Sequence, residues 1–116
     1  MFNILLPPNE IIVLDIAGSH ARVGCARLGC SVLEKIKALA SLGFVPDGDQ
    51  MVMQIGDDRS RVLLVQALIG IGALFVGGKN WSPSEIVDLF REQGKIFTGY
   101  RMITWKRQNE YKIIGR

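Results

Sequence analysis

Apolar and polar residues are arranged along the chain in two kinds of pattern, and each kind predicts one type of secondary structure. Runs of β-branched residues, or alternation of apolar and polar ones, predict strands at 10–17, 21–28, 50–55, 95–105 and 110–114. Apolar residues three and four positions apart predict helices at 32–42, 59–76 and 83–93. The approximate order β-β-α-β-α-α-β-β predicts a single α+β domain, residues 1–116, in which antiparallel hairpins pack with three helices.

The start of the helix at 83–93 has the clearest local signal. Ser82 is a typical N-cap residue, Pro83 suits the first helical position, and Glu85 completes a capping box. Trp81 precedes the cap, and we expect its ring to pack on Ile86 in the first turn. These residues predict where the helix begins to within a residue or two.

The longest apolar segment, 62–78, contains no charged residue. Its length is at the lower limit for crossing a membrane, and Gln66 and four glycines make it less apolar than a typical span. We therefore expect a buried helix at 59–76, and a membrane span is the alternative. Gly70 and Gly72 weaken such a helix, but they let a neighbouring element come close.

The composition fits a globular protein, because 48% of the 116 residues are hydrophobic and 22% are charged. A chain of this length leaves part of its apolar surface uncovered, so we expect a homodimer. No secretory signal is evident at the start, and two cysteines are too few for a disulfide-built domain, so we expect a cytoplasmic protein without a membrane anchor.

Positive charge is concentrated in the last part of the chain. Residues 91–116 contain seven basic and two acidic residues, a net of +5, whereas the whole chain has +3. Aromatic residues alternate with these cations, a combination that suits phosphate contacts and base stacking. The expected nucleic-acid contacts are Lys95, Arg101, Lys106, Arg107 and Lys112 to phosphates, with Trp105 or Tyr111 stacking on bases. An acidic protein is the alternative partner, and a basic edge that only prevents strand-to-strand aggregation is the non-binding alternative.

A doubled pentapeptide at 21–30, ARVGCARLGC, places Cys25 and Cys30 five residues apart and five residues after His20. This spacing turns side chains away from one another in both strands and helices, so we expect no metal site. Ser19 is adjacent to His20, and we expect their side chains to point apart. The sequence leaves open whether the two cysteines pair.

These observations favour a non-enzymatic binding protein without a cofactor, since 70–80 completes neither a dinucleotide-binding nor a P-loop pattern. A second hypothesis is a homo-oligomeric adaptor or inhibitor that uses the apolar helix 59–76. A third is a small enzyme whose site the sequence does not reveal.

Overall fold

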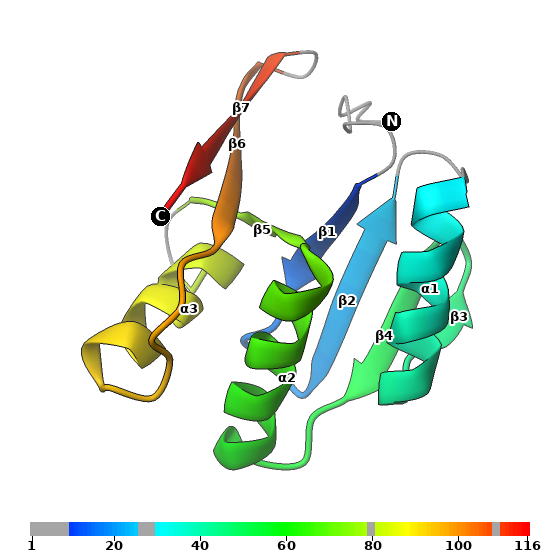
Figure 1. Ribbon diagram of the computed structural model, residues 1–116, viewed down its shortest axis with the longest axis horizontal. Coiled ribbons are helices and arrows are strands. Elements are labelled where there is room, and N and C mark those ends of the chain that lie inside the picture. Colours follow the sequence, from blue (N-terminus) through cyan, green and yellow to red (C-terminus); the bar gives the residue numbers. More distant parts are fainter. Residues whose placement is uncertain (1–9, 26–29, 79–80, 108–109) are drawn as a thin grey trace.

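One mixed sheet, with helices packed on one of its faces, organises the chain (Figure 1). The computed structural model describes residues 10–25, 30–78, 81–107 and 110–116, and within them three helices and seven strands confirm the predicted α+β class. The elements in chain order are β1 (Ile11–Asp15), β2 (His20–Cys25), α1 (Cys30–Leu42), β3 (Val45–Asp47), β4 (Gln50–Gln54), α2 (Asp58–Ile71), β5 (Leu74–Val76), α3 (Pro83–Glu92), β6 (Arg101–Arg107) and β7 (Glu110–Gly115).

The strand order is β3-β4-β2-β1-β5-β6-β7. The outer parts are antiparallel, with β2 pairing to both β1 and β4, and with hairpins β3–β4 and β6–β7 at the two edges. The central strands β1, β5 and β6 are parallel, because the chain returns through a helix before β5 and again before β6. The sequence predicted neither β3 nor β5, and both have only three residues.

The strands bury apolar side chains on both faces. On the helix face, Ile11 and Val13 of β1 join Phe75 of β5 and the buried residues of α1, α2 and α3 in one large cluster. On the opposite face, Ile12, Leu74 and Ile103 form a smaller cluster whose members are all 0% exposed. Neighbouring residues of a strand point to opposite faces, so the alternation along β1 supplies both clusters.

Helix α2 is shorter than the predicted helix at 59–76, and the last part of that prediction is wrong. The helix begins at its N-cap Asp57, whose side chain accepts the amide of Ser60 at 2.7 Å. It ends at Gly72, which has a φ of 92° in the left-handed region that side chains disfavour. The apolar residues after it form β5 instead, which pairs with β1 and β6. Within the described residues, no helix is long and apolar enough to cross a membrane.

Helix α3 begins as its sequence predicts. The Ser82 hydroxyl accepts the amide of Glu85 at 3.4 Å, and Pro83 occupies the first turn. The packing of Trp81 on Ile86 stays a prediction, and most of the Trp81 surface faces solvent, since the residue is 67% exposed. Its φ of 68° lies in the left-handed region, which is unusual for a residue of this size.

Candidate nucleic-acid interface

The β6–β7 hairpin extends beyond the rest of the described fold and carries most of the predicted contacts (Figure 1). Its strands pair from Arg101 opposite Gly115 up to Arg107 opposite Glu110. The register shifts between Trp105 and Arg107, which marks a bulge next to the tip. A bulge increases local twist and so turns the side chains of the tip relative to those of the lower hairpin.

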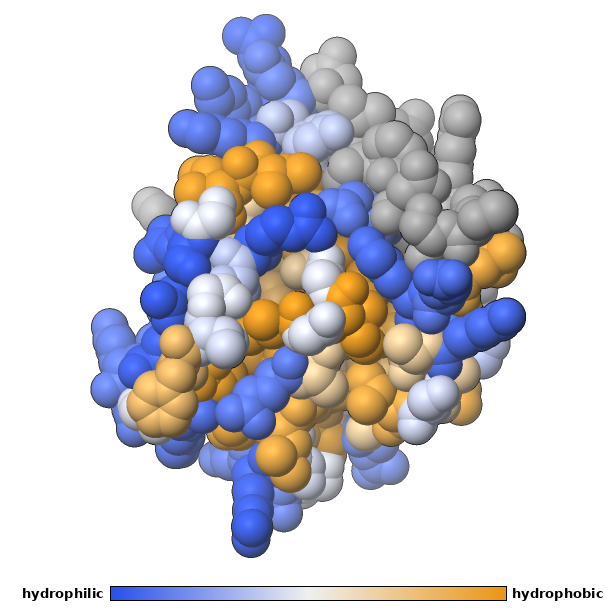
Figure 2. Space-filling model, viewed as in Figure 1, coloured by the Kyte–Doolittle hydropathy of each residue, from blue (hydrophilic) through white to orange (hydrophobic). Residues whose placement is uncertain are grey.

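Three exposed cations lie towards the tip of this hairpin. Lys106 and Arg107 end β6, and Lys112 lies on β7. Glu110 is the acidic residue beside them, and its carboxylate is 4.0 Å from Arg107 Nε, with both side chains more than half exposed. An exposed pair at this distance contributes little to stability. The tip of the hairpin therefore carries three cations and one acid, a net charge of +2. In Figure 2 the top of the molecule, where the hairpin ends, is correspondingly hydrophilic.

The two predicted stacking residues lie side by side at the same level of the hairpin. Trp105 pairs across the strands with Tyr111, and both are partly buried against Ile12, Leu74 and Ile103. A cross-strand aromatic pair of this kind stiffens a two-stranded ribbon. Only the outer part of each ring is therefore available for a base.

Arg101 lies at the base of the hairpin, where its guanidinium is bonded within the protein. Its Nη1 donates to Glu10 Oε2 at 2.7 Å, and its Nη2 donates to Glu10 Oε1 at 3.2 Å and to the Gly72 carbonyl at 2.6 Å. Partial burial raises the pKa of Glu10, but hydrogen bonds from Arg101 and Lys35 outweigh this, and the net pKa is below its usual range. Arg101 therefore joins elements of the fold.

Lys95 belongs to the segment that links α3 to β6, and this segment enters the hairpin at the end opposite its tip (Figure 1). Lys95 is exposed, and its ammonium group sits 5.7 Å from the centre of the Phe90 ring. The structure thus brings Trp105, Lys106, Arg107, Tyr111 and Lys112 together on one ribbon. It leaves Lys95 and Arg101 outside that group.

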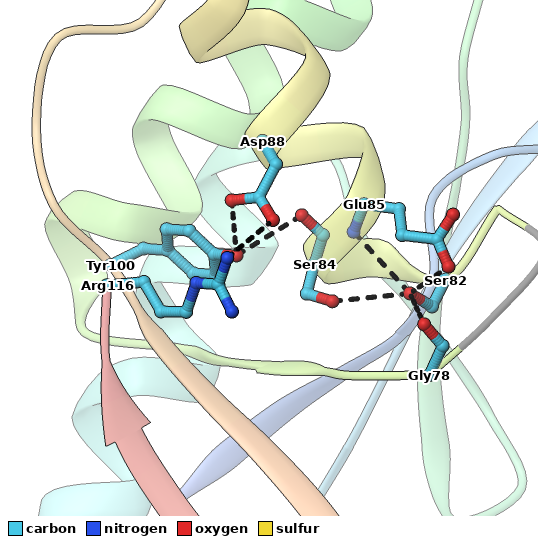
Figure 3. Close-up of polar contacts among 7 residues, drawn as sticks. All are labelled: Gly78, Ser82, Ser84, Glu85, Asp88, Tyr100 and Arg116. Atoms are coloured by element: carbon cyan, nitrogen blue, oxygen red, sulfur yellow. Dashed lines mark hydrogen bonds and ion pairs between the residues drawn. The ribbon is translucent and has the colours of Figure 1, made fainter.

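A polar network fixes the base of the hairpin to α3 (Figure 3). The Tyr100 hydroxyl contacts Asp88 Oδ1 at 2.8 Å and the Ser84 carbonyl at 3.2 Å, and Arg116 Nη2 donates to Asp88 Oδ2 at 3.3 Å. Tyr100 and Arg116 also exchange two backbone hydrogen bonds, of 3.1 and 2.8 Å. In the same view the Ser82 hydroxyl lies 3.2 Å from that of Ser84. The hairpin therefore projects from a fixed base, which sequence spacing did not reveal.

The doubled pentapeptide provides no described site. Cys25 ends β2 and Cys30 begins α1, but residues 26–29 and both cysteine side chains lie outside what the structure describes. Among described residues, no group of three or more His, Cys, Asp or Glu could hold a metal ion. The expectation that Ser19 and His20 point apart is wrong: Ser19 Oγ lies 3.0 Å from His20 Nδ1. Ser19 lies in the turn before β2 and His20 is the first residue of the strand, so strand alternation does not relate their side chains.

The sequence also gave no indication of a cavity of about 700 Å³ beside the end of β1. Its lining includes Asp15 of β1 and Arg61 of α2, and it also includes Trp81 and Lys95 from the segments flanking α3. The one signal available was Trp81, an aromatic residue placed directly before a helix cap. A capping pattern predicts a helix start, but it does not predict that the preceding ring stays exposed.

Comparison with known proteins provides no relative from which a function could be transferred. No family model, no curated protein and no solved structure matches the chain.

Proposed function

We propose that the protein binds nucleic acid and that the tip of the β6–β7 hairpin holds the phosphate backbone. The observation that carries this proposal is the group of three exposed cations, Lys106, Arg107 and Lys112, facing one acid on a projecting ribbon. Nucleic acids attract such groups because each neutralised phosphate releases condensed counterions. The proposal is narrower than the seven contacts predicted from the sequence, since Arg101 is held by Glu10 and Lys95 lies in the segment before β6.

The shape of the hairpin supports contact with a duplex. A two-stranded ribbon fits the major groove of DNA, which is about 12 Å wide. Partial burial of Trp105 and Tyr111 leaves less ring surface for stacking than a single-strand binder uses. We therefore expect binding dominated by phosphate contacts and weakly dependent on base sequence.

The test is fluorescence anisotropy with labelled duplex and single-stranded oligonucleotides at salt concentrations from about 50 to 200 mM. Three phosphate contacts predict that log affinity falls with log salt with a slope near −2.7, at about −0.9 per contact. The double variant Lys106→Gln/Arg107→Gln should reduce the magnitude of the slope by about 2 and weaken binding to all sequences alike.

The matched control is Lys37→Gln/Arg59→Gln, which removes two exposed cations from helices α1 and α2. Binding that is insensitive to salt, or an equal loss in the control, contradicts the proposal. Salt-dependent binding to an acidic protein with none to nucleic acid would identify the alternative partner. The expected homodimer stays a prediction, which light scattering of the same preparation tests.

A further inference from the structure

A cavity of about 700 Å³ lies apart from the hairpin tip, and its volume is in the range of small-molecule sites. Asp15 at the end of β1 and Gly18 in the following turn form part of its lining, with Asp58 and Arg61 from the first turns of α2. Leu89 and other residues of α3 provide the apolar part. The cavity thus combines apolar side chains, most of them on α3, with four charged groups, and ligand sites commonly join these two kinds of lining.

The charged part of the lining is held in place by the fold. Arg61 Nη1 donates to the carbonyls of Ile16 at 2.6 Å and Gly18 at 2.8 Å, which ties α2 to the β1–β2 turn. Gln66 Nε2 donates to the Lys95 carbonyl at 3.2 Å, which ties α2 to the segment after α3. These contacts join all three surrounding segments, so the cavity is formed before any ligand enters.

Trp81 is an exposed aromatic residue that lines this cavity from the segment before α3. Among the described residues it is the one non-glycine with a positive φ, 68°, and its side chain is 67% exposed. Backbone strain of this kind is concentrated at ligand clamps and active sites. The Trp81 amide donates to Glu85 Oε2 at 3.4 Å, so the cap of α3 holds this backbone conformation while the residue stays exposed. The ring lines the cavity together with Phe90, where it can cover the flat face of a ligand.

The charges of the lining balance. Asp15 and Asp58 supply two carboxylates, and Arg61 and Lys95 supply two cations. Asp58 is 3.4 Å from Arg61 Nε, so this pair partly satisfies itself. Asp15 and Lys95 then remain as the oppositely charged groups best placed to meet a ligand, with Asp15 also accepting the Ala17 amide at 3.1 Å. Because the charged lining is net neutral, it suits a net-neutral zwitterion, whereas a polyanion such as a nucleotide phosphate would bring excess negative charge beside two carboxylates.

We propose that this cavity binds a small zwitterion with an aromatic body, the class that includes free aromatic amino acids. The amine of the ligand is bound by Asp15, its carboxylate by Lys95, and its ring by Trp81 and the apolar side of α3. The proposal does not rest on nucleic-acid binding, because it uses a different surface.

The test is titration of isotope-labelled protein with L-phenylalanine, followed by amide chemical shifts in NMR spectra. A ligand of this size predicts a Kd on the order of 1 mM. 2-Phenylethylamine lacks the carboxylate and 3-phenylpropionate lacks the amine, so each should bind about tenfold more weakly. The largest shifts should fall on amides around Asp15, Gly18 and Trp81.

Variants separate the cavity from unspecific binding. Asp15→Asn and Lys95→Gln should each weaken L-phenylalanine about tenfold, and their matched controls Asp49→Asn and Lys37→Gln should leave it unchanged. Trp81→Gly should abolish measurable binding without lowering Tm, since glycine adopts this φ freely. No shifts with L-phenylalanine at about ten times the expected Kd, or equal affinity in Trp81→Gly, overturns the site. If 2-phenylethylamine or 3-phenylpropionate binds as tightly as L-phenylalanine, the proposal that the ligand is a zwitterion is overturned.

Discussion

Glu10 and Arg101 form a two-pronged ion pair between residues 91 positions apart in the chain, with N···O distances of 2.7 and 3.2 Å. Glu10 precedes β1 and Arg101 begins β6, so the pair spans the short strand β5 between them. Lys35 of α1 adds a third contact to the carboxylate at 3.0 Å, and Arg101 also reaches the Gly72 carbonyl that ends α2. The Glu10–Arg101 pair thus connects the parallel strands to two helices, to α1 through Lys35 and to the end of α2 through Gly72.

We expect Glu10→Gln to lower the free energy of unfolding by about 1–2 kcal/mol, because hydrogen bonds to a charged group are lost in a partly buried position. The matched control is Glu110→Gln, which removes an exposed carboxylate from a 4.0 Å pair and should change stability by less than about 0.5 kcal/mol. Urea unfolding at pH 7 measures both. Equal effects of the two substitutions would show that the Glu10 pair contributes no more than a surface contact.

The stability of the protein should fall at acid pH partly through Glu10. Its pKa is lowered in the folded state, so as pH falls the unfolded chain takes up the proton first. The contribution is fully present above the unfolded value of about 4.3 and is lost as pH falls through the lower folded pKa. The difference between wild type and Glu10→Gln should therefore shrink between about pH 5 and pH 3. Asp57 also has a lowered pKa, through its hydrogen bonds with Ser60. Asp57 is present in both wild type and Glu10→Gln, so its effect cancels in the difference between their stabilities. A difference that stays constant over this range contradicts the assignment.

Two nearby glycines should respond to alanine in opposite directions. Gly70 lies within α2 and a Cβ there would meet nothing within 4 Å, so Gly70→Ala should stabilise the protein by about 0.5–1 kcal/mol. Gly72 ends the helix with a φ of 92°, so Gly72→Ala should destabilise it by about 1 kcal/mol or more. Thermal unfolding followed by circular dichroism distinguishes the two signs. A stabilising Gly72→Ala would contradict the left-handed helix end.

The start of α3 could be predicted from sequence because its cause is local. Ser82 and Glu85 are three residues apart, and one hydrogen bond between them fixes the start of α3. The end of α2 was missed for a different reason. Periodicity continues through Gly72 in an apolar segment, and only pairing with β1 and β6 decides that the residues after it form a strand.

The candidate interface was predictable in composition but only partly in arrangement. Lys106 and Arg107 are neighbours in the chain and Lys112 returns on the paired strand, so a hairpin brings them together by short-range geometry. Arg101 shares their composition, but its partner Glu10 lies 91 residues away, and no local pattern identifies such a contact. The cavity depends on segments from β1 to α3, so its charge balance appears only after folding.

Tyr100 should contribute to stability through a hydroxyl that stays protonated at unusually high pH. Burial raises its pKa, and the hydrogen bond and negative charge of Asp88 raise it further, well above the usual value near 10. At pH 7, Tyr100→Phe should lower the free energy of unfolding by about 1–2 kcal/mol, because Asp88 and the Ser84 carbonyl lose a donor.

The same substitution separates the contribution of the Tyr100 hydroxyl from other effects of high pH on stability. A raised folded pKa means that the unfolded chain loses the proton first as pH rises, so the contribution is present below about pH 10 and decreases above it. The advantage of wild type over Tyr100→Phe should therefore narrow between about pH 10 and pH 11, as measured by urea unfolding of both proteins at each pH. The tyrosinate absorbance of the folded wild type should also show a late step that Tyr100→Phe lacks. An advantage that persists unchanged at the higher pH, or the absence of that late step, would show that the Tyr100 hydroxyl is accessible to water and is not held by Asp88.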